Sequence, residues 1–363
     1  MKRERIRVTA ALAVVVILLG GLAGPAAAQG KPKVAFIYVG PVGDAGWTYQ
    51  HDQARSHLEQ TLGVETKFVE SVPETAEVAR VMEQFIRQDF KIIFATAFGY
   101  QNFSLEVAKK HPDVRIIGIG PAIGLAPNVK TIYGRIWEGR YLTGLVAGKM
   151  TKSNTIGFVA AHPISTVVAG VNAFALGVWS VKPDAKIKVV WTRTWYDPPK
   201  EKAAAKALLD AGADVIAQHQ DTPSPLQAAA EASKLGIGSE SNMQRFAPPA
   251  YLTGTIWDWR ETDAAIVKAI MNGQFKSEDY YGGLSDKMVT LGPFNERVPE
   301  DVRALVEQRR KGIVDESFPI FKGPLKDQGG RVRVAEGKSM SLKEILGFDW
   351  LLQGIEGQAP TAR

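Results

Sequence analysis

The chain has 363 residues, of which 45% are hydrophobic and 23% are charged, and these values are typical of a soluble protein with about two domains. It contains no cysteine, which excludes a disulfide framework, a zinc–thiolate site, a catalytic cysteine and a lipid-modified cysteine. The formal net charge is +6, and it falls to +3 when the four basic residues and the one acidic residue of the first 28 positions are left out. The remaining basic residues are spread along the chain, so we expect no nucleic-acid partner.

The first 28 residues form a segment of a different kind. Four basic residues precede an apolar run over residues 8–22, and three alanines at 26–28 supply the small residues of a cleavage site. We therefore expect residues 1–28 to be a cleaved secretory signal peptide. No later stretch has the apolar length of a membrane span, and no cysteine is present to carry a lipid, so we expect the mature chain to be periplasmic and not lipidated.

A strand, a loop and a helix are expected over residues 33–58. The apolar run at 34–39 predicts a buried strand, and the glycines and proline that follow it predict a loop. Asp44 and Trp47 lie in this loop and offer a carboxylate and a large flat ring. Ligands bind open α/β sheets at the carboxyl ends of strands, so both residues are candidates for binding, although a Trp after a turn is also common in cores.

Strands and helices alternate from residue 66 onward. One helix is expected over 75–88, where apolar residues recur at the spacing of a single buried face. Strands that alternate with helices predict parallel sheets covered by helices on both faces, and the alternation restarts at residue 155, so we expect two α/β domains of similar topology. Further strands are expected at 91–97, 114–118, 155–161, 186–194, 213–218 and 251–257, and further helices at 102–110, 131–150 (after a short strand), 166–179, 199–211 and 224–235.

The segment after residue 257 is too short for a third domain, so we expect it to complete the first two. It contains a predicted helix at 261–272, a glycine-rich piece at 280–283, a strand at 286–291, a helix at 299–311 and a tail with a hairpin and a small helix. The predicted boundaries are 31–135 plus 256–283 for the first lobe, 136–255 plus 284–325 for the second lobe, and 326–363 for a C-terminal hairpin and helix that pack back on the lobes. Crossing segments at 133–137, 253–257 and 281–284 are expected to act as hinges.

Sequence motifs of enzymes, nucleotide cofactors and metals are missing. Neither G-x-G-x-x-G nor a P-loop pattern follows any predicted strand, and Pro41 removes a backbone N–H from the first loop. The five histidines show no metal-ligand spacing, and no G-x-S-x-G occurs. We therefore expect no enzyme activity, no catalytic residues, no cofactor and no metal site.

Aromatic and polar residues follow several of the predicted strands. Parallel strands bring such residues to one edge of a sheet, and two facing domains would line one cleft with them. Flat rings stack on aromatic side chains, and carboxylates or amides pair with ring N–H and amino groups, so a planar, uncharged ligand fits. The candidate ligand-binding residues are Asp44, Trp47, Phe98, Tyr100, Trp195, Tyr196, Gln220, Asp221 and Trp257, each of which taken alone could instead belong to a core or a hinge.

Three segments carry patterns of a known family. They are KVAFIYVGPVGDAGWTYQHDQ at 33–53, GRIWEGRYLTGLVAGKM at 134–150, which contains E-x-x-Y-L-x-G-x-x-A-G, and WYDPPKEKAAAKALLDAGADVI at 195–216. Together with Asp327-Gln328 in the tail, they resemble the basic membrane protein family of ABC-transporter substrate-binding proteins, which includes purine nucleoside receptors. The resemblance covers about residues 31–358. It implies the type I periplasmic binding protein fold, in which two Rossmann-like α/β lobes with parallel sheets are joined by crossing hinge segments.

The resemblance also implies roles for individual residues. Asp44 matches the aspartate of the family's first loop, and Trp47 matches its base-stacking aromatic residue. The second stacking residue falls at Trp195 or Tyr196, and a polar ligand contact falls near Gln220 or Asp221. The chain departs from the family where the usual G-G-T-G sequence gives way to His-Gln-Asp-Thr-Pro at 219–223, and where an acidic pair is replaced by Glu-Ser-Asn at 240–242. These positions often meet the sugar of a nucleoside, so a nucleobase such as adenine is at least as well supported as a nucleoside.

The expected function is that of a monomeric periplasmic substrate-binding protein, which binds a purine between its lobes and delivers it to the membrane permease of an ABC importer. One alternative is an extracytoplasmic ligand sensor that serves a signalling receptor. A second alternative is a secreted nucleoside hydrolase, which would need several aspartates around Ca²⁺, whereas the first loop supplies only Asp44.

Overall fold

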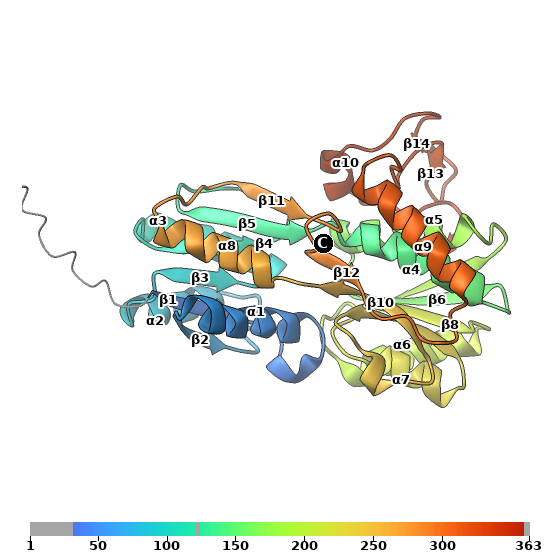
Figure 1. Cartoon of the computed structure of the whole chain (residues 1–363), viewed down its shortest axis with the longest axis horizontal. Helices are drawn as coiled ribbons and strands as arrows, with labels where there is room; N and C mark the ends of the chain where they lie inside the picture. Colours follow the sequence, from blue (N-terminus) through green and yellow to red (C-terminus); the bar gives the residue numbers. More distant parts are fainter. Residues whose placement is uncertain (1–31, 121–123, 359–363) are drawn as a thin grey trace, which may run out of the picture. The chain divides into compact units, whose positions relative to one another are not determined.

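The computed structural model describes residues 32–120 and 124–358, so the expected signal peptide at 1–28 lies outside the described residues. The described chain forms two large sheets with the helices that cover them, and a two-stranded sheet near its C-terminal end (Figure 1). Within the described ranges, none of the helices combines the length and the apolar character needed to cross a membrane. The structure confirms the expected α/β class with mainly parallel sheets.

The first sheet has six strands in the order β11-β5-β4-β3-β1-β2, and every neighbouring pair is parallel. Successive residues of a strand point to opposite faces. Accordingly, Val34 and Phe36 pack on the side of α1, whereas Ala35 and Ile37 pack with residues of α2. The strands are β1 (Lys33–Ile37), β2 (Glu65–Val69), β3 (Ile92–Ala95), β4 (Arg115–Ile119), β5 (Val129–Gly134) and β11 (Asp279–Gly282), and the helices beside them are α1 (Trp47–Leu62), α2 (Glu77–Arg87), α3 (Gln101–Lys110) and α8 (Arg260–Met271).

The second sheet has seven strands in the order β12-β10-β9-β8-β6-β7-β15, and only the β10–β12 pair among them is antiparallel. Its strands are β6 (Thr155–Ala160), β7 (Lys186–Trp191), β8 (Val215–His219), β9 (Leu235–Glu240), β10 (Tyr251–Trp257), β12 (Val289–Leu291) and β15 (Ile355–Glu356). Its helices are α4 (Ile136–Met150), α5 (Ser165–Trp179), α6 (Pro198–Asp210), α7 (Ser224–Glu231) and α9 (Glu300–Val314). In the tail, β13 (Leu325–Lys326) pairs antiparallel with β14 (Val332–Val334), and α10 (Leu342–Leu346) follows.

The glycines of α4 have a packing role. A Cβ atom at Gly144 would overlap the carbonyl oxygen of Phe174 in α5, and one at Gly177 would overlap the carbonyl oxygen of Tyr141. The two helices therefore approach each other closely only because both positions are glycine. This close contact offsets the helix propensity that glycine costs.

Two strands differ from the sequence prediction. The helix expected at 224–235 ends at Glu231, and a strand that was not predicted, β9, begins at Leu235. Glycines at 236 and 238 lower the strand propensity of this segment, but a Cβ at Gly238 would lie 2.7 Å from the ring of Tyr251 in β10, so the glycine is needed for packing. Likewise, the glycine-rich piece expected near 280–283 forms β11, which pairs with β5.

The chain passes between the first and second sheets three times. It crosses from β5 to α4, from β10 to α8, and from β11 to β12 (Figure 1). The first and third crossings are joined by hydrogen bonds, because the backbone N–H of Arg135 donates to the Gly282 carbonyl oxygen and Glu138 accepts from the Leu284 N–H at 2.8 Å. The carboxyl ends of the parallel strands of both sheets consequently meet near these crossings.

Candidate ligand-binding site

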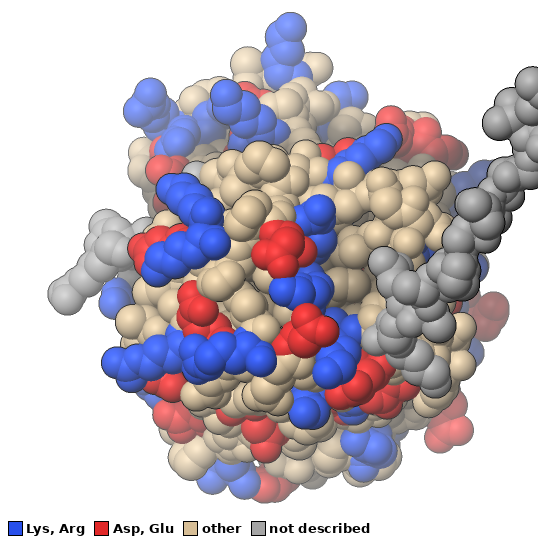
Figure 2. Space-filling view, turned by 90° about the vertical axis from the view of Figure 1, so that its left-hand side faces the viewer, with Lys and Arg blue, Asp and Glu red and all other residues tan. Residues whose placement is uncertain are grey.

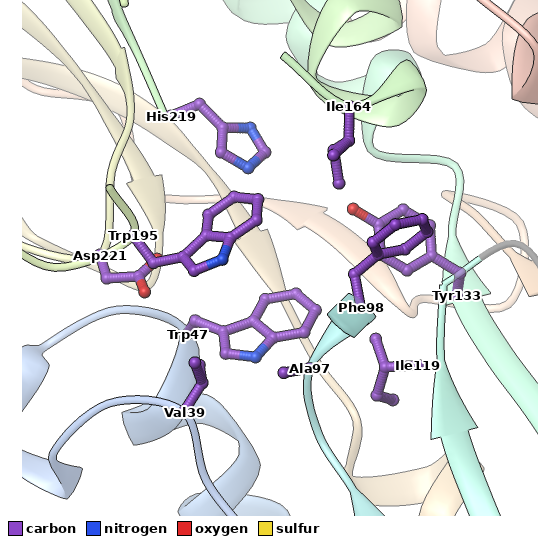
Figure 3. Close-up of a pocket in the computed structure, with 10 residues that line it drawn as sticks. All are labelled: Val39, Trp47, Ala97, Phe98, Ile119, Tyr133, Ile164, Trp195, His219 and Asp221. Carbon is purple, nitrogen blue, oxygen red and sulfur yellow. The ribbon is translucent and has the colours of Figure 1, made fainter. Parts of the chain in front are cut away.

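A cavity lies between residues that follow strands of the first sheet and residues that follow strands of the second (Figure 3). The cavity has a volume of about 40 Å³. The cavity is therefore narrow and fits a thin group better than a bulky one. From the first-sheet side it is lined by Val39, Trp47, Ala97, Phe98, Ile119 and Tyr133, and from the second-sheet side by Ile164, Trp195, His219 and Asp221.

Trp47 forms the first wall, and it is held from several directions. Its indole N–H donates to the Thr96 carbonyl oxygen at 2.7 Å. The rings of Trp257, Trp259 and His51, which we call the aromatic cage, lie 5.5, 5.4 and 4.8 Å from its ring centre, all at steep angles. The orientation of the Trp47 ring is thus fixed by protein contacts alone.

Asp44 is buried beneath this wall and caps the start of α1. Its carboxylate accepts hydrogen bonds from the backbone N–H groups of Gly46 at 2.7 Å, Thr48 at 2.8 Å and Tyr49 at 3.0 Å. Burial raises the pKa of Asp44 to about 6, and the backbone donors act in the opposite direction. These bonds occupy the carboxylate and fix the helix start that carries Trp47, so they do not support a direct ligand contact for Asp44.

Trp195 forms the opposite wall and is held less firmly. Its ring lies 4.6 Å from that of His162, and its indole N–H lies 3.4 Å from a carboxylate oxygen of Glu74, a residue on the first-sheet side of the cavity. Its carbonyl oxygen accepts a hydrogen bond from the Asp221 N–H at 3.3 Å. The contact with Glu74 means that the Trp195 wall is completed by both sides of the cavity.

Asp221 is the carboxyl group that faces the cavity (Figure 3). The side chain is 4% exposed, and among the described residues none donates a hydrogen bond to its carboxyl oxygens. Burial, and then the nearby carboxyl groups of Asp44, Glu240 and Glu201, hold the pKa of Asp221 well above its usual value. A ligand that offers N–H donors would therefore supply partners that this group lacks.

A buried charged network lies behind His219. The guanidinium of Arg140, on α4, donates to the Gln218 carbonyl oxygen at 2.7 Å, to Ser239 Oγ at 2.6 Å and to Glu240 Oε1 at 3.3 Å. It also lies 3.3 Å from His219 Nδ1. Burial lowers the pKa of Arg140 to about 10, so the guanidinium stays charged at neutral pH.

Four of the predicted site residues line this cavity, namely Trp47, Phe98, Trp195 and Asp221. The other five have different surroundings. Asp44 caps α1, as described above, and the Tyr100 hydroxyl donates to the Val72 carbonyl oxygen at 2.5 Å in the core beside the first sheet. Tyr196 is 41% exposed and lies in an outer depression beside Pro41. Gln220 is buried and donates to Thr192 Oγ1 at 2.8 Å, and Trp257 is buried and donates to Glu240 from within the aromatic cage.

Six lining residues were not among the predicted set, namely Val39, Ala97, Ile119, Tyr133, Ile164 and His219. Most of them follow a strand or end one, so the strand-end rule that selected Trp47 and Phe98 also applies to them. Four are small or aliphatic, and such residues give no chemical signal that separates a cavity wall from a core. His219 carried the clearest signal, because it stands at the end of β8 directly before the predicted Gln220 and Asp221.

Comparison with known proteins gives the family. The profile of the family described as ABC transporter substrate-binding protein PnrA-like matches residues 31–318. A purine-binding protein of Brucella abortus (strain 2308) is 39% identical over 93% of this chain and 97% of its own length. A protein of Haloferax volcanii, named as a candidate ABC transporter glucose-binding protein, is 35% identical over 91% of this chain and 81% of its own length.

Solved structures give the fold. An ABC transporter solute-binding protein from Aeropyrum pernix K1 superposes with a TM-score of 0.71 at 18% sequence identity, over 82% of this chain and 93% of that chain. This likeness confirms the expected periplasmic binding protein fold. The family match and the relatives confirm the expected resemblance to substrate-binding proteins.

Proposed function

Because the chain belongs to the PnrA-like family of ABC transporter substrate-binding proteins, we propose that it binds a purine, as the free nucleobase, in the cavity between Trp47 and Trp195. Substrate-binding proteins of ABC importers work outside the cytoplasm and deliver their ligand to a membrane permease. The observation that carries the proposal is the presence of two indole rings and one unpaired carboxyl group, that of Asp221, around one narrow space.

Stacking supplies most of the recognition in this proposal. Each indole presents a flat face, and stacking of a base on an aromatic side chain contributes about 1 to 3 kcal/mol. Phe98 adds a third aromatic ring to the lining. A purine ring placed between Trp47 and Trp195 would replace the small free volume of the cavity with contacts on both of its faces.

Asp221 would recognise the polar groups on the edge of the purine. A carboxylate only accepts hydrogen bonds, and its bonds to N–H donors are charge-assisted. Donors on the edge of a purine would therefore stabilise the ionised form of Asp221, which burial disfavours. The cavity is narrow, and its polar groups are mainly those of His219, Asp221 and the Tyr133 hydroxyl, which already donates to Thr166 Oγ1. This lining offers little for the many hydroxyl groups of a ribose or a hexose and favours a nucleobase.

The remaining parts of the proposal concern the state of the protein. We take the mature protein to be a periplasmic monomer that has lost residues 1–28 and carries no lipid. Its two lobes, with the boundaries expected from the sequence, would close on the ligand at the three crossings. Basic and acidic side chains lie interspersed on the face drawn in Figure 2, and this mixture favours a small-molecule ligand over nucleic acid as the partner of that face.

Thermal unfolding of mature protein (residues 29–363) with adenine, hypoxanthine, guanine, adenosine, uracil and glucose tests the proposal. A ligand at 100 times its dissociation constant stabilises the folded state by about 2.7 kcal/mol, which gives a clear shift of the melting temperature. We expect the largest shift with a purine base and a smaller one with adenosine. A shift with glucose and none with the purines would overturn the proposal in favour of a sugar.

A further inference from the structure

We infer that Arg140 fixes His219 as a neutral imidazole whose Nε2–H donates to an acceptor atom of the bound ligand, so that His219 determines which purine edge is accepted. The inference rests on the proposed function, because it concerns the same cavity. It assigns a specificity-determining role to His219 and a positioning role to Arg140, which does not reach the cavity itself.

The geometry of Arg140 leaves His219 one arrangement. The guanidinium is fully buried, and its Nη2 lies 3.3 Å from His219 Nδ1 and 2.6 Å from Ser239 Oγ. An arginine side chain can only donate hydrogen bonds and stays protonated. Nη2 carries two N–H groups, of which one donates to Ser239 Oγ and the other lies 3.3 Å from both His219 Nδ1 and Glu240 Oε1. A proton on Nδ1 would set two donors against each other there, so a neutral imidazole with Nδ1 as the acceptor and its proton on Nε2 fits this geometry.

The charged groups around His219 agree with this arrangement. Arg140 approaches from α4, and the Glu240 carboxylate from β9 lies 3.9 Å from Nε2, which is too far for a hydrogen bond. The Trp195 ring lies 6.4 Å from the imidazole, and Asp221 follows two residues later. Burial and the positive charge of Arg140 hold the pKa of His219 well below its ordinary value.

The imidazole points toward the cavity, with one ring nitrogen on the side of Trp195 and Trp47 (Figure 3). Because Nδ1 is turned to Arg140, this nitrogen is Nε2. The cavity thus presents a donor, His219 Nε2–H, and an acceptor, Asp221, beside the Tyr133 hydroxyl, which donates to Thr166 Oγ1 at 3.2 Å. The first two groups select a planar ligand whose edge carries both a ring-nitrogen or carbonyl acceptor and an N–H donor.

Nuclear magnetic resonance of ¹⁵N-histidine-labelled protein tests the tautomer. Two-bond ¹⁵N–¹H correlation spectra distinguish the Nε2–H tautomer, the Nδ1–H tautomer and the imidazolium, and the His219→Gln variant identifies the His219 signals among the five histidines. We expect the Nε2–H tautomer from pH 5 to pH 8, with or without adenine. The Nδ1–H tautomer or protonation above pH 5 would overturn the inference.

Binding of adenine, 1-deazaadenine, 3-deazaadenine and 7-deazaadenine tests the ligand contact. Each analogue replaces one ring-nitrogen acceptor with C–H. One of the three should bind the wild-type protein about 10-fold more weakly than adenine, the expected effect of leaving a buried donor without a partner. That loss should vanish in His219→Leu and return in part in His219→Gln, whose amide can donate, while His111→Leu, on the far side of the first sheet, should behave as wild type. Equal losses in wild type and His219→Leu would overturn the inference.

The Arg140→Lys variant tests whether Arg140 positions the His219 ring or only supports the fold. The shorter ammonium keeps the charge but cannot hold Nδ1 and Ser239 together, so we expect His219 to sample both tautomers and the discrimination against the weak analogue to shrink. Unchanged tautomer and discrimination in a folded Arg140→Lys protein would remove Arg140 from the inference. If this variant does not fold, the wild-type spectra decide the point alone. If wild type binds no purine at all, the proposed function fails, whereas the spectra still decide whether Arg140 fixes His219.

Discussion

The two walls of the cavity are built from similar residues and held in different ways. The Trp47 ring is enclosed by the aromatic cage of Trp257, Trp259 and His51, and its N–H is paired at 2.7 Å with a backbone carbonyl of the neighbouring strand. The Trp195 ring has one aromatic neighbour within 5 Å, His162, and a long hydrogen bond to Glu74, which belongs to the other side of the cavity. One wall is complete on its own side, and the other depends on the opposite side.

The two aspartates beside these walls repeat the contrast. Both aspartates are buried. Asp44 accepts three backbone hydrogen bonds, whereas the Asp221 carboxyl accepts none from the described residues. A carboxylate with all its partners is part of the framework, and one without partners is available to a ligand. We conclude that the first-sheet wall is preorganised and that the second-sheet wall keeps its polar groups for the ligand.

The largest expected effect comes from Trp47→Ala, which removes the preorganised wall. Loss of the Trp47 ring, which the aromatic cage encloses, should lower the free energy of unfolding by about 3 to 5 kcal/mol. Trp195→Ala, at the partly exposed wall, should lower it by less than about 1 kcal/mol, typical of a surface position. Each should weaken adenine binding by about 1 to 3 kcal/mol.

Chemical denaturation and calorimetry measure these two quantities. Tyr196→Ala is the matched control, because it removes an aromatic ring next to Trp195 that does not line the cavity. Equal destabilisation by Trp47→Ala and Trp195→Ala would show that the two walls do not differ as described.

Asp221→Asn should weaken adenine binding by about 1.5 to 3 kcal/mol, since an amide replaces a carboxylate in a charge-assisted hydrogen bond. The ligand-free protein should lose no stability, because none of the described residues donates a hydrogen bond to the Asp221 carboxyl group. Calorimetric titration at pH 7.5 gives the affinity. An affinity within a factor of two of wild type would place the polar readout elsewhere.

Asp44→Asn should show the opposite pattern. Both carboxylate oxygens of Asp44 accept backbone hydrogen bonds, so the amide group leaves at least one buried N–H without an acceptor and should cost about 1 to 3 kcal/mol of stability. The affinity for adenine should fall less than in Asp221→Asn, because Asp44 acts only through the position of Trp47. A large loss of affinity without loss of stability would return Asp44 to the direct ligand contacts.

The smallest effect is expected in the pH dependence of stability without ligand. The pKa of Asp221 is raised by burial and by neighbouring carboxyl groups, so its contribution to stability is present in full below about pH 4 and is lost as the pH rises through the folded-state pKa. Asp221→Asn removes this loss. The variant should therefore gain stability relative to wild type between pH 5 and pH 7.5, as read from denaturation curves, whereas parallel curves would contradict the assignment.

Much of the fold follows from the sequence because burial periodicity dictates it. The apolar run at β1 and the regular face of α2 identify their elements without reference to tertiary structure. β9 escaped prediction because Gly238 is required by its contact with Tyr251, 13 residues later, and Gly236 by its contact with Leu226, and such contacts leave no periodic signal. β11 has the same character, since it becomes a strand only beside β5.

The site was predictable in part for a related reason. Parallel strands place strand-end residues together, and this rule found Trp47, Phe98, Trp195 and Asp221. The rule does not say which way a side chain turns. Asp44 and Trp257 turn inward to cap a helix and to support Trp47, and only the three-dimensional arrangement of donors distinguishes them from the residues that face the cavity.

A crystal structure of the mature protein grown with adenine tests the central claim most directly. We predict that the purine ring lies between the indoles of Trp47 and Trp195, with an N–H donor on Asp221 and with Trp47 and Asp44 in the positions they hold here. Adenine bound elsewhere, or bound in the cavity with Trp47 turned away from the aromatic cage, would contradict the claim that the Trp47 wall is preorganised and that the opposite wall gains its polar partners from the ligand.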